Sequence, residues 1–181
     1  MLLSKSFINA ADYYASPGVA SGSGSGTYNE PWELFEALNQ IPADQGHTLI
    51  LKNGTYTVTQ SVNIPTGVNF RGETDDSTQV KIYAEGASPI LRLNSARGAF
   101  DPAANGNQTI SYLTIESNYT SDVGIIAIAR NNVSFKSLQV KKMEKNGIII
   151  SGWYANPAYD PAVDPQEPTR ITGSEIAYCY V

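Results

Sequence analysis

The feature that most limits the fold of this chain is an internal repeat in its second half. Residues 107–117 show a short-strand pattern, and the apolar run 123–129 follows after a linker. The same order returns at residues 132–142 and 146–151, about 24 residues later, a period typical of solenoids. One such unit cannot bury its apolar face alone, so we expect stacked units that share one core.

Short strand patterns cover the rest of the chain from His47 onward, with Asn, Gly, Asp, Ser and Pro between them. No second helical pattern interrupts them, which disfavours alternating βαβ units. An antiparallel β-sandwich is the alternative, because Asn53-Gly54 and Asn146-Gly147 suit two-residue hairpins. The repeat favours successive coils, so we predict an all-β fold, a parallel β-helix with coils of about 24 residues.

A helical pattern occurs near the N-terminus. It follows a Gly/Ser run at residues 21–27, of the kind usual in flexible linkers. Asn29 or Glu30 suits the N-cap position, and Pro31 suits the first turn. The apolar stripe of this helix would consist of Trp32, Leu34, Phe35 and Leu38. A helix of about ten residues is not stable alone, so we expect it to cover the open end of the first coil.

The predicted organisation has two parts, an N-terminal segment with the capping helix (1–46) and the β-helix coils (47–181). Residues 171–181 supply strands of a new coil and no capping element. Terminal repeats of a solenoid need a capping face. We therefore expect further C-terminal coils, or a partner, to cover this end.

Composition excludes several classes of function. The net charge of −5 and the absence of a basic cluster disfavour a nucleic-acid partner. No apolar run approaches the roughly 20 residues that a membrane span needs. Cys179 is the only cysteine, so an intrachain disulfide is excluded and we expect a core thiol.

A family resemblance emerges from motifs that follow one another in order along the first half. They are Tyr13-Tyr14-Ala-Ser-Pro-Gly, Gly-Ser-Gly-Thr27, Pro31-Trp32, Leu49-Ile-Leu-Lys-Asn-Gly-Thr-Tyr56, Val62-Asn-Ile and Val68-Asn-Phe-Arg-Gly. Together they resemble the pectate lyase-like superfamily of right-handed parallel β-helix proteins, which includes polysaccharide lyases. The resemblance covers nearly the whole chain and is more specific for fold than for activity. It implies three strands per coil and a secreted protein, extracellular or periplasmic.

The resemblance also implies which sheet would bear a substrate. By analogy that sheet would contain Thr48–Lys52, Pro89–Leu93, Val123–Ala129 and Gly147–Ser151. The sharp turns between the other two sheets would fall near Ser111–Tyr112, Lys136–Ser137 and Gly173–Ser174.

Two arginines are candidate substrate ligands. Arg92 lies on the predicted substrate sheet, and Arg130 follows the next strand, one coil later. Two guanidinium groups at this spacing suit bidentate binding of a uronate carboxylate. The alternative is a pair of solvated surface cations.

The insertion at residues 152–169 supplies further candidates. Aromatic rings beside a groove stack on sugar rings, and nearby carboxylates bind hydroxyls, so we predict that four residues of this loop contact substrate: Trp153, Tyr154, Tyr159 and Asp160. The alternative is a loop whose rings only pack onto the coil. Asp75-Asp76 is predicted to form a polar turn rather than a calcium site, and His47 to be a hydrogen-bonding surface residue rather than a base.

The function predicted from this resemblance is cleavage of an acidic, uronic-acid polysaccharide by β-elimination. Such a lyase must neutralise the carboxylate, for which calcium can serve, and must supply a base and an acid. The sequence shows no complete set of these groups, and calcium is left open as a cofactor. The alternatives are a non-catalytic cell-surface or carbohydrate-binding β-helix protein, or a fragment without the catalytic coils.

Overall fold

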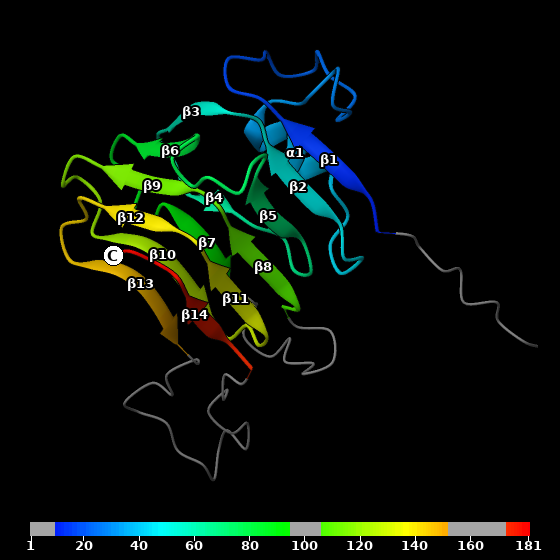
Figure 1. The fold of residues 1–181 in the computed structure, drawn as a ribbon. Helices are drawn as coiled ribbons and strands as arrows, with labels where there is room; N and C mark the ends of the chain where they lie inside the picture. Colours follow the sequence, from blue (N-terminus) through cyan, green and yellow to red (C-terminus); the bar gives the residue numbers. More distant parts are fainter. Residues whose placement is uncertain (1–9, 95–105, 152–172) are drawn as a thin grey trace, which may run out of the picture.

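A computed structural model describes residues 10–94, 106–151 and 173–181 (Figure 1). Its strands form three sheets, named A, B and C here. Sheet A holds, in spatial order, β1 (Asp12–Ala15), β2 (Thr48–Leu51), β5 (Asn69–Gly72), β8 (Gln108–Ser111), β11 (Val133–Lys136) and β14 (Glu175–Ala177). Sheet B holds β3 (Gly54–Val58), β6 (Val80–Ala84), β9 (Thr114–Ser117) and β12 (Gln139–Lys141). Sheet C holds β4 (Val62–Asn63), β7 (Leu91–Asn94), β10 (Val123–Ile128) and β13 (Asn146–Ser151).

The chain visits the three sheets in a fixed order. From β2 to β14 it passes through sheets A, B and C in turn, and one passage through the three sheets is called a round here. Each strand from β5 onward pairs in parallel with the strand one round earlier. The predicted all-β class with parallel strands is therefore confirmed. The hairpin alternative is wrong for Asn53-Gly54, because the strands on either side of this pair, β2 and β3, belong to different sheets.

The rounds differ in length more than the repeat predicted. The rounds from β2 to β5 and from β8 to β11 are short, since Thr48 pairs with Asn69 and Gln108 pairs with Val133. The rounds from β5 to β8 and from β11 to β14 are much longer, and the second of these contains the insertion at residues 152–169. The spacing of about 24 residues thus describes only the rounds without an insertion.

The core lies between the three sheets. Alternate side chains of each strand point inward, as the pleat requires. From β2 to β14 the register of sheet A aligns an inner row whose first four members are fully buried: Leu49, Phe70, Ile110, Phe135 and Ile176. Ile176 is 52% exposed, because no further described strand lies beyond β14.

The corners between sheets A and B use left-handed backbone. Tyr112, Ser137 and Tyr178, which follow β8, β11 and β14, have φ values of 58°, 50° and 55°. The turns predicted at Ser111–Tyr112 and Lys136–Ser137 are confirmed. The turn predicted at Gly173–Ser174 is wrong, because Lys136 pairs with Ala177 and the third corner is therefore at Tyr178. At the other end of these strands Asn132 donates a side-chain hydrogen bond of 2.9 Å to Asn107, so a stacked asparagine pair lies there.

The helix α1 (Leu34–Gln40) begins later than predicted. Its N-cap is Glu33, whose carboxylate accepts hydrogen bonds from the backbone of Phe35 and Glu36. Residues 30–32 cannot be helical, because Trp32 pairs with Ala15 as an extended bridge. Leu34, Ala37 and Leu38 are buried in the core, and Trp32 and Phe35 pack against it half-buried. Among the described residues no helix is long and apolar enough to cross a membrane.

The N-terminal segment contributes directly to sheet A. Strand β1, which the sequence did not predict, pairs in parallel with β2. The Gly/Ser run is folded rather than a free linker, since Ser25 and Gly26 both donate backbone hydrogen bonds to Glu30 and Gly26 accepts one from Tyr14. Gly26 is required here, because a Cβ at its position would lie 2.5 Å from the Trp32 ring.

Candidate functional site

The predicted substrate sheet corresponds to sheet C, with one correction. Strands β7, β10 and β13 lie side by side in it, as predicted. The strand at Thr48–Leu51 lies instead in sheet A, and β4 takes its predicted place. Each round places its first strand in sheet A, its second in sheet B and its third in sheet C. In the first round these strands are β2, β3 and β4, so β4 lies in sheet C.

Arg92 lies on the outer face of sheet C. Its neighbours Leu91 and Leu93 point into the core and are fully buried, so the Arg92 side chain points outward. The register places it in one row across the sheet with Asn63, Ile126 and Ile149. Within the described part of the chain, its Nε atom is shielded from solvent and has no hydrogen-bond partner, and the same holds for Oδ1 of Asn94, two positions later on the same face. Buried polar atoms are rarely left unpaired, so these two atoms mark the row as a candidate ligand site.

Arg130 lies in the interior, in contrast to the exposed position that the sequence predicted. Only 3% of it is exposed. Its guanidinium group donates hydrogen bonds to the carbonyl oxygens of Ile64 and Asn94, at 2.8 and 2.7 Å, and to Oε1 of Gln108 at 3.1 Å. Burial lowers the pKa of Arg130 to about 10, so the group remains charged at neutral pH. These bonds show a structural role, and Arg130 does not share the outer face with Arg92.

The backbone explains why Arg130 turns inward. Ala129, directly after β10, has a φ of 53°, a left-handed conformation that is uncommon for a residue other than glycine. It ends the regular alternation of inner and outer side chains, and both Arg130 and Asn131 are buried. The other four predicted contacts, Trp153, Tyr154, Tyr159 and Asp160, lie outside the described residues.

Two further predictions concern acids and His47. Asp75 pairs with Arg71 at 2.9 Å, and Asp76 accepts hydrogen bonds from Thr78 and Gln79. This is the polar turn that the sequence predicted, and its carboxylates already have protein partners. His47 is buried rather than at the surface; Nδ1 accepts from the backbone of Ala11, and Nε2 lies 2.8 Å from Oε1 of Gln45. No group of three His, Cys, Asp or Glu residues that could hold a metal ion occurs within residues 10–94, 106–151 and 173–181.

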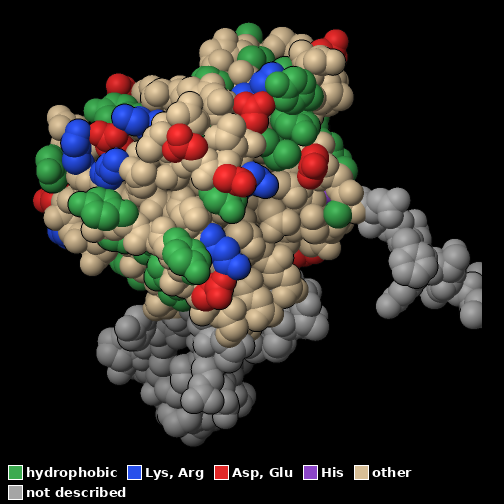
Figure 2. All heavy atoms as spheres, viewed as in Figure 1, with side chains coloured by type: hydrophobic (Ala, Val, Ile, Leu, Met, Phe, Trp, Pro, Cys, Tyr) green, Lys and Arg blue, Asp and Glu red, His purple; other side chains and the backbone are tan. Residues whose placement is uncertain are grey.

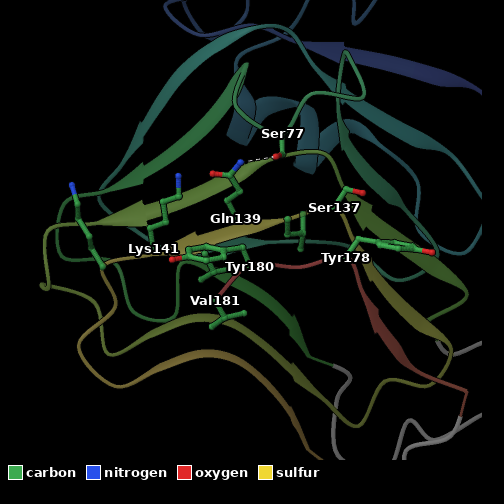
Figure 3. A pocket seen from close by; sticks show the side chains of 10 residues that line it. Ser77, Ser137, Gln139, Lys141, Tyr178, Tyr180 and Val181 are labelled. Atoms are coloured by element: carbon green, nitrogen blue, oxygen red, sulfur yellow. Dashed lines mark hydrogen bonds between the residues drawn. The ribbon is translucent and has the colours of Figure 1, made fainter.

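A groove lies beside β12, where the last described residues pass that strand. We call it the β12 groove; its volume is about 850 Å³. Figure 3 shows Lys141 at one end and Tyr178 at the opposite end, with Tyr180 and Val181 between them. The residues that line it are Ser77, Ser137, Leu138, Gln139, Val140, Lys141, Lys142, Tyr178, Tyr180 and Val181.

Sequence analysis did not find this groove. Ser77 and Gln139 are 62 positions apart, yet their side chains form a 3.0 Å hydrogen bond in the groove wall. A sequence pattern within one segment cannot reveal a contact between residues of different rounds. A local signal in the sequence is the pair Tyr178 and Tyr180, two aromatic residues two positions apart.

A buried carboxylate fixes one lysine of the groove. Glu116, on β9, is only 8% exposed and pairs with Lys142 at 2.7 Å and Lys81 at 2.8 Å. Figure 2 shows Lys and Arg side chains gathered over this side of the molecule, near β6, β9 and β12. The hydrogen bonds from Lys142 and Lys81 lower the pKa of Glu116, and the hydrogen bond to Glu116 raises the pKa of Lys142. Lys142 therefore presents a fixed positive charge at neutral pH.

Glu116 is expected to stabilise the fold in a pH-dependent way. Because its folded-state pKa is depressed, its contribution is present above the pKa of the unfolded chain and is lost as the pH falls through the folded-state value. At pH 7 Glu116→Gln should lower the free energy of unfolding by about 1 kcal/mol, since both lysine partners are partly solvated. Urea unfolding of both proteins from pH 7 to pH 2 would measure this. A difference that stays constant over this range would contradict an electrostatic origin.

Comparison with known protein families, curated proteins and solved structures gave no match for this chain.

Proposed function

We propose that this chain folds as a right-handed parallel β-helix of the pectate lyase-like kind and binds an acidic, uronic-acid polysaccharide on the outer face of sheet C. The fixed order of sheets A, B and C supports the β-helix. Connections between parallel strands are right-handed in nearly all proteins, which supports the handedness. Secretion is part of the proposal, since such polymers occur outside cells.

The observation that carries the binding proposal is the unpaired Nε of Arg92. A shielded guanidinium N–H without an acceptor is unfavourable, and a uronate carboxylate would supply that acceptor. Oδ1 of Asn94, also unpaired, could accept a hydrogen bond from a sugar hydroxyl. Ile126 and Ile149, in the row of Arg92, offer apolar surface to the C–H face of a sugar ring.

The test is calorimetric titration of the protein with hexamers of galacturonate, of alginate and of chondroitin. Arg92→Met should weaken binding of the best hexamer by about 10- to 100-fold, the range for a hydrogen bond to a charged group. Arg71→Met is the matched control, because Arg71 lies on the outer face of sheet A and pairs with Asp75. Equal affinity of the wild-type protein and Arg92→Met would overturn the site, and no binding of any hexamer would overturn the function.

The proposed reaction is β-elimination, and the alternative is binding without cleavage. Incubation with the same three polymers separates the two functions. Rising absorbance from the unsaturated product would show a lyase, and binding without this signal would show a binding protein.

A further inference from the structure

His47 is the only histidine of the chain, and both nitrogens of its ring have partners inside the protein. Only 3% of the residue is exposed. The backbone N–H of Ala11 donates to Nδ1 at 3.0 Å, so Nδ1 carries no proton. The proton of the neutral ring is therefore on Nε2, which donates to Oε1 of Gln45 at 2.8 Å. The ring thus serves as an acceptor on one side and as a donor on the other.

The acceptor nitrogen holds the beginning of β1. Ala11 directly precedes this strand, and its carbonyl oxygen accepts a hydrogen bond of 3.0 Å from the N–H of Thr48. Both backbone groups of Ala11 are therefore bound at the start of β2. Strand β1 has four residues and is the first strand of sheet A in spatial order (Figure 1). So short a strand with few pairing partners is expected to open more easily than the central strands when a terminal contact is lost.

Two aromatic rings extend this contact from His47 to the loop before α1. The rings of His47 and Tyr13 meet edge to face, with centroids 5.3 Å apart, and Tyr13 stacks on Trp32 at 5.4 Å. Trp32 is joined to β1 as well, because its N–H donates to the carbonyl oxygen of Tyr14 at 2.9 Å. We call Ala11, Tyr13, Trp32 and His47 the β1 clamp. A movement of the His47 ring would therefore be transmitted to Trp32.

The β1 clamp requires an uncharged imidazole. An imidazolium donates at both nitrogens, so a proton on Nδ1 would face the N–H of Ala11 and remove its acceptor. The hydrogen bond between His47 and Ala11 is therefore present only while the ring is neutral.

The surroundings of His47 do not offset a charge on its ring. Within the described residues no carboxylate forms an ion pair with His47. Asp12, beside Ala11, and Asp44, in the loop before His47, are both exposed. Strand β1 presents the Tyr13 ring, and β5 presents the neutral Asn69, whose N–H donates to the His47 carbonyl oxygen. A buried charge without a partner is unfavourable, so the charged ring favours a form in which it can leave this position.

We propose that proton uptake by His47 opens the β1 clamp, so that acid releases the beginning of β1 from β2. The neutral ring holds Ala11 in the closed form, and only the open form leaves Nδ1 free to take up a proton. Falling pH therefore shifts the population from the closed form to the open form. Imidazole side chains change charge between about pH 5 and pH 8, above the range of most carboxylates. The proposed function is not involved, since no residue of the β1 clamp lies in sheet C.

The test follows the ring and the strand separately in the full chain. Because His47 is the only histidine, the NMR signals of its ring report the protonation of this residue alone. Hydrogen exchange of the Ala11, Tyr14 and Thr48 amides reports whether the clamp is closed. From about pH 7.5 to about pH 5.5 these amides, after correction for the intrinsic pH dependence, should exchange about tenfold faster, as expected for the loss of one hydrogen bond.

Reference amides and two variants separate His47 from other groups that titrate. The amides of Val62 and Ile64 donate hydrogen bonds outside the clamp and should keep their exchange rates. His47→Asn places an amide oxygen near the position of Nδ1, an acceptor that takes up no proton, so exchange at Ala11 should be the same at both pH values. Gln45→Ala removes the partner of Nε2 but leaves that of Nδ1, so it should retain the response to acid.

Each outcome decides the proposal. A common midpoint of ring titration and faster amide exchange supports the clamp. A ring that takes up a proton while the amides keep their exchange rates overturns it, and so does a ring that stays neutral at about pH 5.5. An equal response to acid in the wild type and His47→Asn assigns the change to another group and overturns it as well. If urea unfolding shows His47→Asn to be unfolded, the two wild-type titrations still decide.

Discussion

Phe70→Ala is expected to lower the free energy of unfolding by about 3–5 kcal/mol, the range for a buried aromatic side chain truncated in a core. Phe70 is fully buried in the inner row of sheet A, with Leu49 on one side and Ile110 on the other. Its strand β5 lies in the middle of the sheet, so the cavity would be enclosed by β2 and β8 and could collapse little.

Urea unfolding followed by circular dichroism measures this change. Tyr119→Ala is the control, since Tyr119 is exposed and its truncation should change stability by less than about 0.5 kcal/mol. Phe135→Ala, in the same inner row, should cost as much as Phe70→Ala. A Phe70→Ala variant as stable as the Tyr119→Ala control would show that this row is not the core.

Arg130→Met should cost about 2–5 kcal/mol of stability, because it leaves several buried acceptors without a donor. Methionine approximates the length of the arginine stem, so little packing is lost. The carbonyls of Ile64 and Asn94 and the amide of Gln108 would each lose a hydrogen bond. These residues come from three separate rounds, which the guanidinium group joins at one point.

Thermal unfolding of Arg130→Met beside Arg71→Met provides the comparison. Arg71 makes an ion pair with the exposed Asp75, and pairs of this kind contribute at most about 1 kcal/mol. Arg130→Lys should recover little of the loss, because one ammonium group cannot reproduce the planar fork of donors. If Arg130→Met proved as mild as Arg71→Met, the buried network would be unimportant for stability.

The sequence was sufficient to predict strand positions and turns where one round resembles the next. The turns that the family resemblance implied at Ser111–Tyr112 and Lys136–Ser137 are correct, since β8 and β11 pair without an insertion between their rounds. The resemblance also placed β10 and β13 in one sheet, where the structure has them. In these places the spacing along the chain translates directly into register.

The sequence was not sufficient to predict the structure where one residue, or a contact with a residue distant in sequence, determines the local backbone. Because Trp32 forms an extended bridge with Ala15, the helix begins only at Leu34. Helix propensity depends on the local sequence and cannot predict that contact. One left-handed residue, Ala129, reverses the direction expected for Arg130. The β12 groove joins Ser77 to Gln139, and only the three-dimensional arrangement of the rounds brings them together.

The separation of paired strands along the chain has a consequence for folding kinetics. Every strand of sheet A pairs with a strand from another round, and the partners in its longest rounds, Phe70 with Ile110 and Ser134 with Glu175, are far apart in sequence. Such pairing requires loop closure before any contact is gained, so folding in milliseconds to seconds is expected rather than the microseconds of helical bundles. The shortest connections within sheet A, from β2 to β5 and from β8 to β11, have the lowest entropic cost of loop closure. We therefore expect one of these two strand pairs to be formed in the transition state for folding.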